Sequence, residues 1–398
     1  MGLNVEKIRG DFLVLQKRIV YFDNSCVTLR PRQVVEAMNK YYYEFSGCAG
    51  RSMHQFGNRT TQEVDLSRKQ LRKFIDAKKD EEVIFTRNTT EGINLVANSF
   101  NFKKGDKVLI TDKEHNSNLL PWQLLAEKGT IKLEVINSKP DNTFSMEEFE
   151  EKVKDAKLVS IVHTSNLDGV TNPAREIIKT ARKNGVLVML DAAQSAPHKE
   201  LSVRDLDVDF LAFSGHKMLG PSGMGALYGK KELLEELNPF LVGGETVKDT
   251  TYTSREWENL PERFEAGLQN YAGIMGFAEA TRYLEKIGLK NIEKHEEKLN
   301  SQLTDGLNKY GDVKIIGPSP DKRGGITSFT IGKSDPHQIA MLLDHSANIM
   351  IRSGAHCVHS WFNKHKISGT ARASLYLYNT PQEVDYFLEN IKKIRKLL

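Results

Sequence analysis

The chain has 398 residues, of which 39% are hydrophobic and 27% are charged, as in an ordinary globular protein. This composition excludes a fibrous or mainly disordered chain. With 56 Lys and Arg against 52 Asp and Glu, the net charge of +4 is too small for the electrostatic footprint of a nucleic-acid-binding protein. No apolar run approaches the roughly 18 residues of a membrane span, and the N-terminal stretch lacks an uninterrupted signal-peptide core. We therefore expect neither nucleic acid nor a membrane as a partner.

The three cysteines, Cys26, Cys48 and Cys357, are widely spaced and include no C-x-x-C pair. An odd count with this spacing is not a disulfide framework. It fits a reducing compartment, where a lone thiol can carry out chemistry. The cysteines therefore indicate a cytoplasmic protein.

Short apolar runs alternate with helical patterns through the first two-thirds of the chain. Most of these runs are continuously apolar, as buried parallel strands are, whereas residues 131–136 alternate and favour a position near a sheet edge. Alternating β and α units predict an open, mainly parallel sheet with ligands at the carboxyl ends of its strands. The expected strands are 83–85, 108–110, 131–136, 158–162, 186–190, 210–213 and 226–228, and the helices between them include 91–100, 146–156 and 173–183.

The character of the sequence changes after about residue 267. Two long helical patterns, 271–287 and 289–309, precede a compact α+β pattern. The sequence thus predicts an α/β protein with a large domain at 17–283 and a small domain formed by 1–16 and 284–398. In the small domain we expect strands at 325–331, 349–352 and 373–377 and helices at 336–346 and 381–398.

A single lysine, Lys217, opens a glycine-rich loop directly after a predicted strand, with Ser214 and His216 just before it. A lysine in this position can form a Schiff base with an aldehyde cofactor, while its neighbours donate hydrogen bonds to a phosphate. The alternative is a surface lysine in a tight turn, because lysines are usually exposed. The loop matches neither a Walker A sequence nor G-x-G-x-x-G.

Two further segments stand at predicted strand ends. Asp191 follows the run 186–190, where a carboxylate can pair with a protonated pyridine nitrogen, although such residues often only cap helices. Thr89 and Thr90 lie between a strand and a helix, where hydroxyls and free N–H groups can bind phosphate. A capping box is the alternative for the two threonines.

These segments, TTEGINLVA, DAAQS and SGHK-x-x-GP, occur in this order with His115 between the first two. Together they resemble the fold type I enzymes that depend on pyridoxal 5′-phosphate (PLP), and more narrowly the class V aminotransferase superfamily. The resemblance implies a large domain with a mainly parallel seven-stranded sheet and a smaller α+β C-terminal domain. It also implies PLP as cofactor. The residues implied to bind it are Lys217, Asp191, Gln194, Thr89, Thr90, Ser214, His216 and His115, the last stacked on the ring and assisting proton transfer.

The segment RSGAHC, which ends at Cys357, is followed 15 positions later by Arg372. This arrangement resembles the SUF-type (group II) cysteine desulfurases, in which the cysteine is the nucleophile and the arginine holds the substrate carboxylate. By the same resemblance Asn166 lies near the carboxylate. The alternatives for Cys357 are a buried hydrophobic thiol and a metal site with the nearby histidines. Cys357 and the nearby histidines include no second cysteine, so we expect no metal at this place.

The resemblance implies that L-cysteine is converted to L-alanine with a persulfide on Cys357, for iron–sulfur cluster assembly. It also implies a homodimer and, as partner, a small sulfur-acceptor protein or a SUF scaffold. Two alternatives stay open. One is a related class V enzyme, such as a selenocysteine lyase, a cysteine sulfinate desulfinase or another amino-acid lyase or transaminase. The other is a weakly active paralogue that acts as a binding partner in sulfur assembly.

The sequence departs from the family pattern at several positions. Leu268 replaces a threonine that contacts the cofactor phosphate of the neighbouring subunit in the family. Gly50 replaces a histidine, and Val358-His359-Ser360 follows the nucleophile in place of A-x-P. Cys26 replaces an alanine, which predicts a second thiol near the site.

Overall fold

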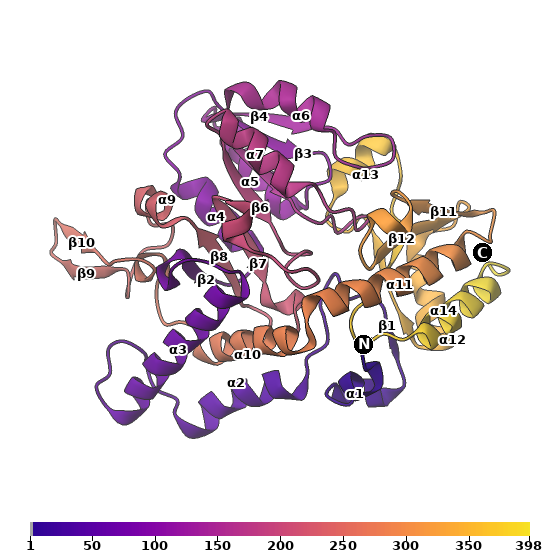
Figure 1. Ribbon diagram of the computed structural model, residues 1–398, viewed down its shortest axis with the longest axis horizontal. Coiled ribbons are helices and arrows are strands. Elements are labelled where there is room, and N and C mark those ends of the chain that lie inside the picture. The colour runs from indigo at the N-terminus through magenta and orange to yellow at the C-terminus, as the bar shows by residue number, and fades with distance from the viewer. Residues whose placement is uncertain (1–2) are drawn as a thin grey trace.

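A seven-stranded sheet is the largest element of the computed structural model, which describes residues 3–398 (Figure 1). Its strands are β2 (Val83–Thr86), β3 (Asp106–Thr111), β4 (Ile131–Ile136), β5 (Ala156–Val162), β6 (Leu187–Asp191), β7 (Phe210–Ser214) and β8 (Gly225–Gly229). They lie in the order β2-β8-β7-β6-β5-β3-β4. β8 runs in the direction opposite to the other six strands. The predicted α/β class and the mainly parallel seven-stranded sheet are confirmed.

All seven predicted apolar runs are strands of this sheet, and the alternating run 131–136 is its edge strand β4. Side chains of β2 alternate between two hydrophobic cores, with Val83 and Phe85 in one and Ile84 in the other. Since both faces of the sheet are covered, a strand in its middle is apolar at every position. This explains why the inner strands read as continuous apolar runs.

Helices cover both faces of the sheet, and α2, α3 and α10 pack together along one side of it (Figure 1). In α7, the buried residues Ala174, Ile177, Ile178 and Ala181 form the stripe that an amphipathic helix turns toward a core. The helices of this part are α2 (Arg32–Glu44), α3 (Gln55–Phe74), α4 (Thr89–Ser99), α5 (Asn116–Glu127), α6 (Met146–Lys152), α7 (Ala174–Lys183), α8 (Val203–Leu206), α9 (Lys231–Glu236) and α10 (Tyr271–Ile287). A hairpin of β9 (Val247–Thr250) and β10 (Arg255–Trp257) projects from the body.

The C-terminal part has its own antiparallel sheet and its own hydrophobic core. The sheet consists of β11 (Val313–Ile316), β12 (Ile326–Ile331), β15 (Thr370–Ser374) and β14 (Arg352–Gly354), in that spatial order. Its helices are α11 (Leu289–Leu307), α12 (Pro336–Ala347), α13 (His359–His365) and α14 (Pro381–Ile394). Near the chain start, α1 (Val5–Arg9) is followed by β1 (Val20–Tyr21), which pairs in parallel with β13 (Ile349–Met350).

One predicted strand is misplaced: the run expected at 373–377 is β15, which ends at Ser374. Leu375 N still donates to Gly325 O (2.7 Å) in the register of β12, but Tyr376 N turns away from the ladder and donates to Asn379 Oδ1 (2.8 Å). The apolar residues that follow are buried in a turn. Apolar character therefore reported burial here and not strand structure.

The predicted domain boundary after residue 283 falls inside α10. The N-terminal residues contact both parts of the chain: Phe12 belongs to the core of the large sheet, and Arg9 pairs with Glu383 on α14 (2.8 Å). The division into 17–283 and 1–16 with 284–398 thus stays a prediction.

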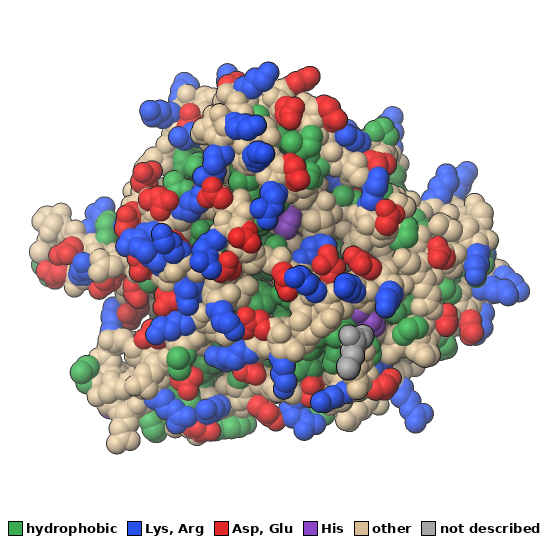
Figure 2. Space-filling view, in the orientation of Figure 1, with side chains coloured by type: hydrophobic (Ala, Val, Ile, Leu, Met, Phe, Trp, Pro, Cys, Tyr) green, Lys and Arg blue, Asp and Glu red, His purple; other side chains and the backbone are tan. Residues whose placement is uncertain are grey.

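Charges on the surface are mixed, since blue and red side chains are interspersed over the face drawn in Figure 2. Within residues 3–398, no helix combines the length and the apolar character needed to cross a membrane.

Candidate active site

One cavity of about 230 Å³ gathers the residues that the sequence singles out. It lies at the carboxyl ends of β6 and β7, where Asp191 and Ser214 are the last strand residues and Lys217 follows directly in a short 3₁₀ turn. Strand ends of this kind are the usual ligand sites of open α/β sheets. The predicted residues that line the cavity are Thr89, Thr90, His115, Asn166, Asp191, Gln194, Ser214, His216, Lys217, Cys357 and Arg372.

Lys217 and Asp191 form the electrostatic centre of the cavity. Burial lowers the pKa of Lys217, and the Asp191 carboxylate opposes that shift. Burial likewise raises the pKa of Asp191, against the influence of Lys217. The Asp191 carboxylate accepts a hydrogen bond from Ala193 N (2.9 Å) and forms no ion pair within residues 3–398. It can therefore receive a cationic ring nitrogen.

Hydroxyl groups and the start of α4 form one end of the cavity. Thr89 N donates to Ser214 Oγ (2.8 Å), and the Thr90 hydroxyl lies 2.7 Å from that of Ser117. The helix cap is Asn88, whose Oδ1 accepts from Glu91 N (3.0 Å). Because Asn88 does the capping, both threonines lie inside the helix, where their hydroxyls form pairs with Ser214 and Ser117 at an N-terminus that can bind an anion.

His115 caps α5, and its Nδ1 accepts a hydrogen bond from Ser117 N (3.1 Å). Burial, together with the positive charges of Lys217 and Arg372, lowers the pKa of His115 to about 3. The imidazole is thus neutral at physiological pH. Since Nδ1 is an acceptor, the ring proton resides on Nε2. Burial also lowers the pKa of His216 to about 4.

Arg372 is nearly inaccessible to solvent and reaches the cavity from β15. Its Nη1 donates to Asn166 O (2.9 Å), its Nη2 lies 3.5 Å from Asp23 Oδ1, and its Nε has no partner among the described residues. Burial lowers the pKa of Arg372 to about 10. A buried guanidinium with an unused N–H is suited to hold a carboxylate.

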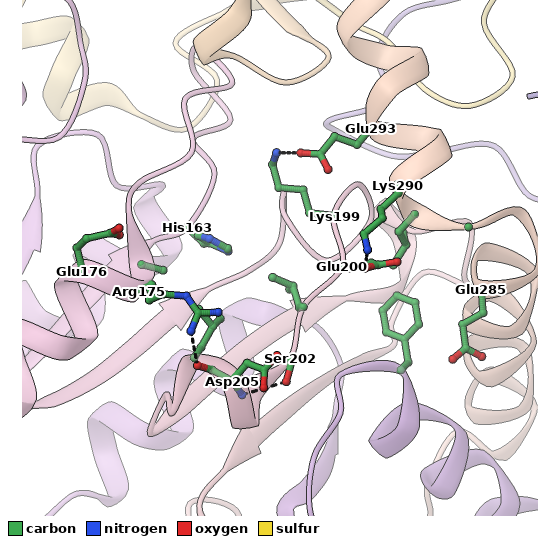
Figure 3. Close-up of a pocket in the computed structure, with 16 residues that line it drawn as sticks. His163, Arg175, Glu176, Lys199, Glu200, Ser202, Asp205, Glu285, Lys290 and Glu293 are labelled. Carbon is green, nitrogen blue, oxygen red and sulfur yellow. Dashed lines mark hydrogen bonds and ion pairs between the residues drawn. The ribbon is translucent and has the colours of Figure 1, made fainter. Parts of the chain in front are cut away.

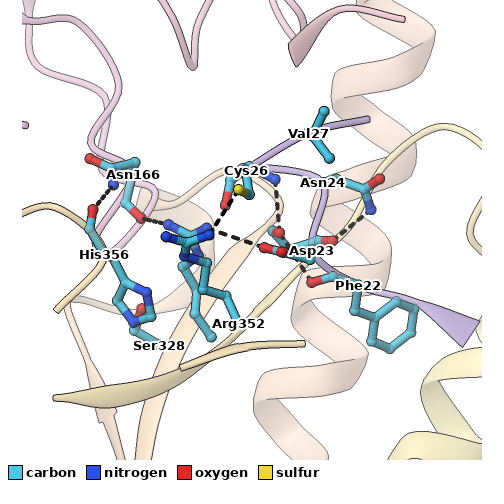
Figure 4. A network of polar contacts seen from close by, with 12 residues as sticks. Phe22, Asp23, Asn24, Cys26, Val27, Asn166, Ser328, Arg352 and His356 are labelled. Atoms are coloured by element: carbon cyan, nitrogen blue, oxygen red, sulfur yellow. Dashed lines mark hydrogen bonds and ion pairs between the residues drawn. The ribbon is translucent and has the colours of Figure 1, made fainter. Parts of the chain in front are cut away.

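Cys357 lies on a loop after β14 in an unusual backbone conformation. His356 and Cys357 both have positive φ angles (48° and 60°), which non-glycine residues rarely adopt. Hydrogen bonds from the large-sheet side hold the loop: Asn116 N donates to Cys357 O (2.7 Å) and Asn166 Nδ2 donates to His356 O (2.7 Å, Figure 4). The His356 ring is anchored to Thr370 Oγ1 (2.8 Å).

Sequence reasoning did not assign roles to several other lining residues: Ser25, Asn88, Ser117, Arg352 and His356. The signal for Arg352 and His356 was their place in the segment that ends at Cys357. Cys26 also lines the cavity, as its departure from the family pattern predicted, whereas Gly50 and Leu268 do not. Across residues 3–398, no three His, Cys, Asp or Glu side chains gather closely enough to hold a metal ion.

A larger hollow of about 830 Å³ lies between the large domain and α11, and none of the predicted residues lines it (Figure 3). Its basic side chains are engaged: Lys199 pairs with Glu293, Lys290 with Glu200 (3.1 Å), and Arg175 donates to Asp205 O (2.9 Å). Among the described residues, this hollow therefore offers no unengaged lysine or arginine to an anionic ligand, and the residues that the sequence singles out lie in the smaller cavity.

Comparison with known proteins agrees with this geometry, because the sequence profile of the aminotransferase class-V family matches residues 20–387. The chain belongs to the class-V aminotransferases. It is 42% identical to a probable cysteine desulfurase of Pyrococcus abyssi and 37% identical to a cysteine desulfurase of Haloferax volcanii. Both alignments cover 99% of this chain and 98% of the relative.

Solved structures of this class-V family resemble the chain over its whole length. The apo structure of a cysteine desulfurase from Thermococcus onnurineus superimposes with a TM-score of 0.96, at 41% identity, over 100% of this chain and 99% of the other. A cysteine desulfurase of Escherichia coli in an S-sulfonic acid form gives 0.93 at 30% identity, over 99% of each chain.

Proposed function

We propose that this class-V protein is a PLP-dependent cysteine desulfurase, which converts L-cysteine to L-alanine and leaves a persulfide on Cys357. The observation that carries the proposal is the meeting of three groups in one cavity. These groups are a lysine amine, a buried carboxylate-binding arginine and a cysteine on a separate loop, namely Lys217, Arg372 and Cys357. The names of the full-length relatives support it.

The residues of the cavity fit PLP. Within residues 3–398, Gln194 Oε1 and Asn166 Oδ1 are buried without hydrogen-bond partners, as fits polar atoms that contact a polar ligand. Asp191 would pair with the ring nitrogen, Gln194 would bond the ring hydroxyl, and His115 would stack on the ring. The phosphate would be bound by Thr89, Thr90, Ser214 and His216.

When bound, PLP supplies an electron sink that stabilises negative charge at the substrate Cα. The residues of the chain do the remaining work. Arg372 holds the carboxylate of L-cysteine in a fork, with Asn166 beside it. The Lys217 amine, whose pKa burial lowers, takes and returns the Cα proton, and His115 assists with proton transfer.

The Cys357 thiolate attacks the sulfur of the substrate. The substrate C–S bond breaks, a Cys357 Sγ–S bond forms, and a proton replaces sulfur on the carbon skeleton to give alanine. The thiolate must be the attacking form. This assignment also supports the narrower SUF-type (group II) reading, because only α13 and a short turn separate Cys357 from β15 and Arg372.

We also infer a homodimer, a role in iron–sulfur cluster assembly with a small sulfur-acceptor protein or a SUF scaffold, and a cytoplasmic setting. The dimer is supported by apolar side chains that α2, α3 and the loop between them expose: Tyr42, Tyr43, Met53 and Phe56. The cytoplasmic setting is supported by three free thiols, since a persulfide carrier needs reduced cysteines.

The test is alanine formation from L-cysteine under reducing conditions by the PLP-loaded wild type and by Cys357→Ala. We expect alanine and sulfide from the wild type and neither from the variant. Equal alanine from both would reject Cys357 as the nucleophile. No alanine from either would reject L-cysteine as the substrate, and selenocysteine and cysteine sulfinate would then be assayed.

A further inference from the structure

Two of the three free cysteines share the active-site cavity. Cys26 and Cys357 both line it, whereas Cys48 lies outside, near the hydroxyl of Tyr271 (3.8 Å). Burial lowers the pKa of Lys217, and the charges of Asp191, Cys26 and Cys357 each act in the opposite direction. Both sulfur atoms therefore lie within electrostatic range of the same amine.

The Cys26 sulfur is in direct contact with a cation, because Arg352 Nη1 lies 2.9 Å from Cys26 Sγ (Figure 4). A guanidinium has only donors, so the sulfur is the acceptor in this contact. A neighbouring arginine is a recurrent feature of reactive cysteines, since the thiolate is the nucleophile. Cys26 thus has the surroundings of a reactive thiol, not those of a packing residue.

The charged side chains around Cys26 support the same conclusion. Arg352 on β14 is the cross-strand partner of Arg372 on β15, and like charges in this position repel each other. Asp23 provides one negative charge, 3.5 Å from Arg372. The Cys26 sulfur occupies the corresponding place beside Arg352, as the acceptor of its Nη1 hydrogen bond.

The two sulfurs differ in how they are held. The backbone beside Cys26 is fixed, because Ser25 N donates to Ser374 Oγ (2.9 Å) and Gln194 Nε2 donates to Ser25 O (2.6 Å). Cys357 is anchored through its carbonyl, and no hydrogen bond to its sulfur is found within residues 3–398. The Cys26 sulfur is thus held by a contact of its own with Arg352, whereas Cys357 is held only through its backbone in the part of the chain that the structure describes.

We propose that Cys26 is a second sulfur carrier of this site, which takes the outer sulfur from persulfidated Cys357. The Cys26 thiolate attacks the outer sulfur of Cys357–S–SH. A Cys26 Sγ–S bond forms, the Cys357 Sγ–S bond breaks, and Cys357 leaves as a thiolate. The products are Cys26–S–SH and a regenerated nucleophile, with no net oxidation or reduction. The step rests on the proposed desulfurase function.

The test counts alanine in a rapid-quench burst, with PLP-loaded protein, L-cysteine and no reductant or sulfur acceptor. Since Cys357 is regenerated once, the wild type should release two alanines per protomer. Cys26→Ala should release one and Cys357→Ala none. Cys48→Ala is the matched control and should release two. Peptide mass spectrometry on the alkylated wild type should find an added sulfur on both Cys26 and Cys357, which requires no variant to fold.

A wild-type burst of one alanine, with the added sulfur on Cys357 alone, would overturn the relay and leave the desulfurase function intact. The absence of any alanine from the wild type would overturn both. A Cys26–Cys357 disulfide with release of sulfide would also overturn the relay, since the sulfur would then leave the protein without being carried by Cys26.

Discussion

The two walls of the cavity are built in different ways. Asp191 and Ser214 end strands β6 and β7, whose positions are almost all buried, and their place is fixed by the core on both faces of the large sheet. Cys357 lies on a loop with two successive positive φ angles, and the loop depends on hydrogen bonds from Asn116 and Asn166 of the opposite wall. The residues proposed to bind the cofactor are thus placed by packing, and the proposed nucleophile is placed by a few polar contacts.

The largest expected effect on activity follows from a substitution in the wall at the ends of β6 and β7, which we call the packed wall. Lys217→Ala should lower alanine formation by roughly 10³-fold or more, because the proton at Cα loses its acceptor and the cofactor loses its covalent attachment point. The measurement is the rate of alanine formation, together with PLP retention after borohydride reduction and denaturation. A loss of less than about tenfold would contradict the role of this lysine.

The next largest effect is expected at Arg372, the residue proposed to bind the substrate carboxylate. Arg372→Lys should raise KM for L-cysteine by roughly 10- to 100-fold, since a lysine cannot reproduce the fork and a charged hydrogen bond contributes about 1.5–3 kcal/mol. PLP binding, measured by absorbance, should be retained. An unchanged KM would sink the assignment of the carboxylate to Arg372.

A smaller effect on activity is expected from removing a hydrogen bond that holds the loop of His356 and Cys357, which we call the loop wall. Asn166→Ala removes the hydrogen bond to His356 O and should lower kcat/KM by about tenfold, as expected for about 1 kcal/mol or slightly more. Alkylation of Cys357 by iodoacetamide should become faster, since the loop is less restrained. The exposed Asn184 on the large-domain surface provides the control, Asn184→Ala, in which both rates should match the wild type.

The smallest effect on activity is expected from a substitution of His163, which lies beside the larger hollow. This substitution should instead change how the free energy of unfolding depends on pH. His163 Nδ1 is buried and has no partner in the described part of the chain (Figure 3). Burial, with a contribution from Lys199, lowers the pKa of His163 to about 4. The unfolded state, with a histidine pKa of about 6.5, therefore binds more protons between these values. Neutral His163 therefore makes its full contribution to the free energy of unfolding above about pH 6.5. This contribution decreases as the pH falls toward 4.

His163→Gln removes this dependence. Relative to wild type, the variant should gain about 2 kcal/mol in free energy of unfolding between pH 7.5 and pH 5, since 1.5 pKa units correspond to that amount. Urea unfolding at both pH values checks it. The exposed His345→Gln is the control. A difference between variant and wild type that is constant with pH would show that His163 titrates normally.

The sequence predicted the packed wall better than the loop wall. The strands of the large sheet were predicted because continuous apolar runs before small polar motifs mark buried strand ends, and Asp191 and Lys217 follow such runs directly. The cap of α4 was not assigned to Asn88, because Asn88 and the threonines beside it are all good capping residues. The strand expected at 373–377 failed because its apolar residues are buried in a turn.

The features that sequence reasoning could not supply depend on contacts between distant segments. The contact of Arg352 with Cys26 joins residues 326 positions apart. The positive φ angles at His356 and Cys357 have no local signal, since neither residue is glycine. Such a conformation persists only where the surrounding structure over-determines it. The motif thus predicted Cys357 as the nucleophile, while the orientation of its loop is a property of the tertiary structure.

The N-terminal end of α5 contacts both walls of the cavity, and this limits how far the two walls can move apart. His115 presents its ring to the cavity, and the next residue, Asn116, holds the Cys357 carbonyl. The hydrogen bond from Asn116 N thus ties the Cys357 backbone to the residue beside His115. A tilt of the C-terminal sheet would have to break or bend this bond, and that of Asn166, before it could move the Cys357 backbone away from His115.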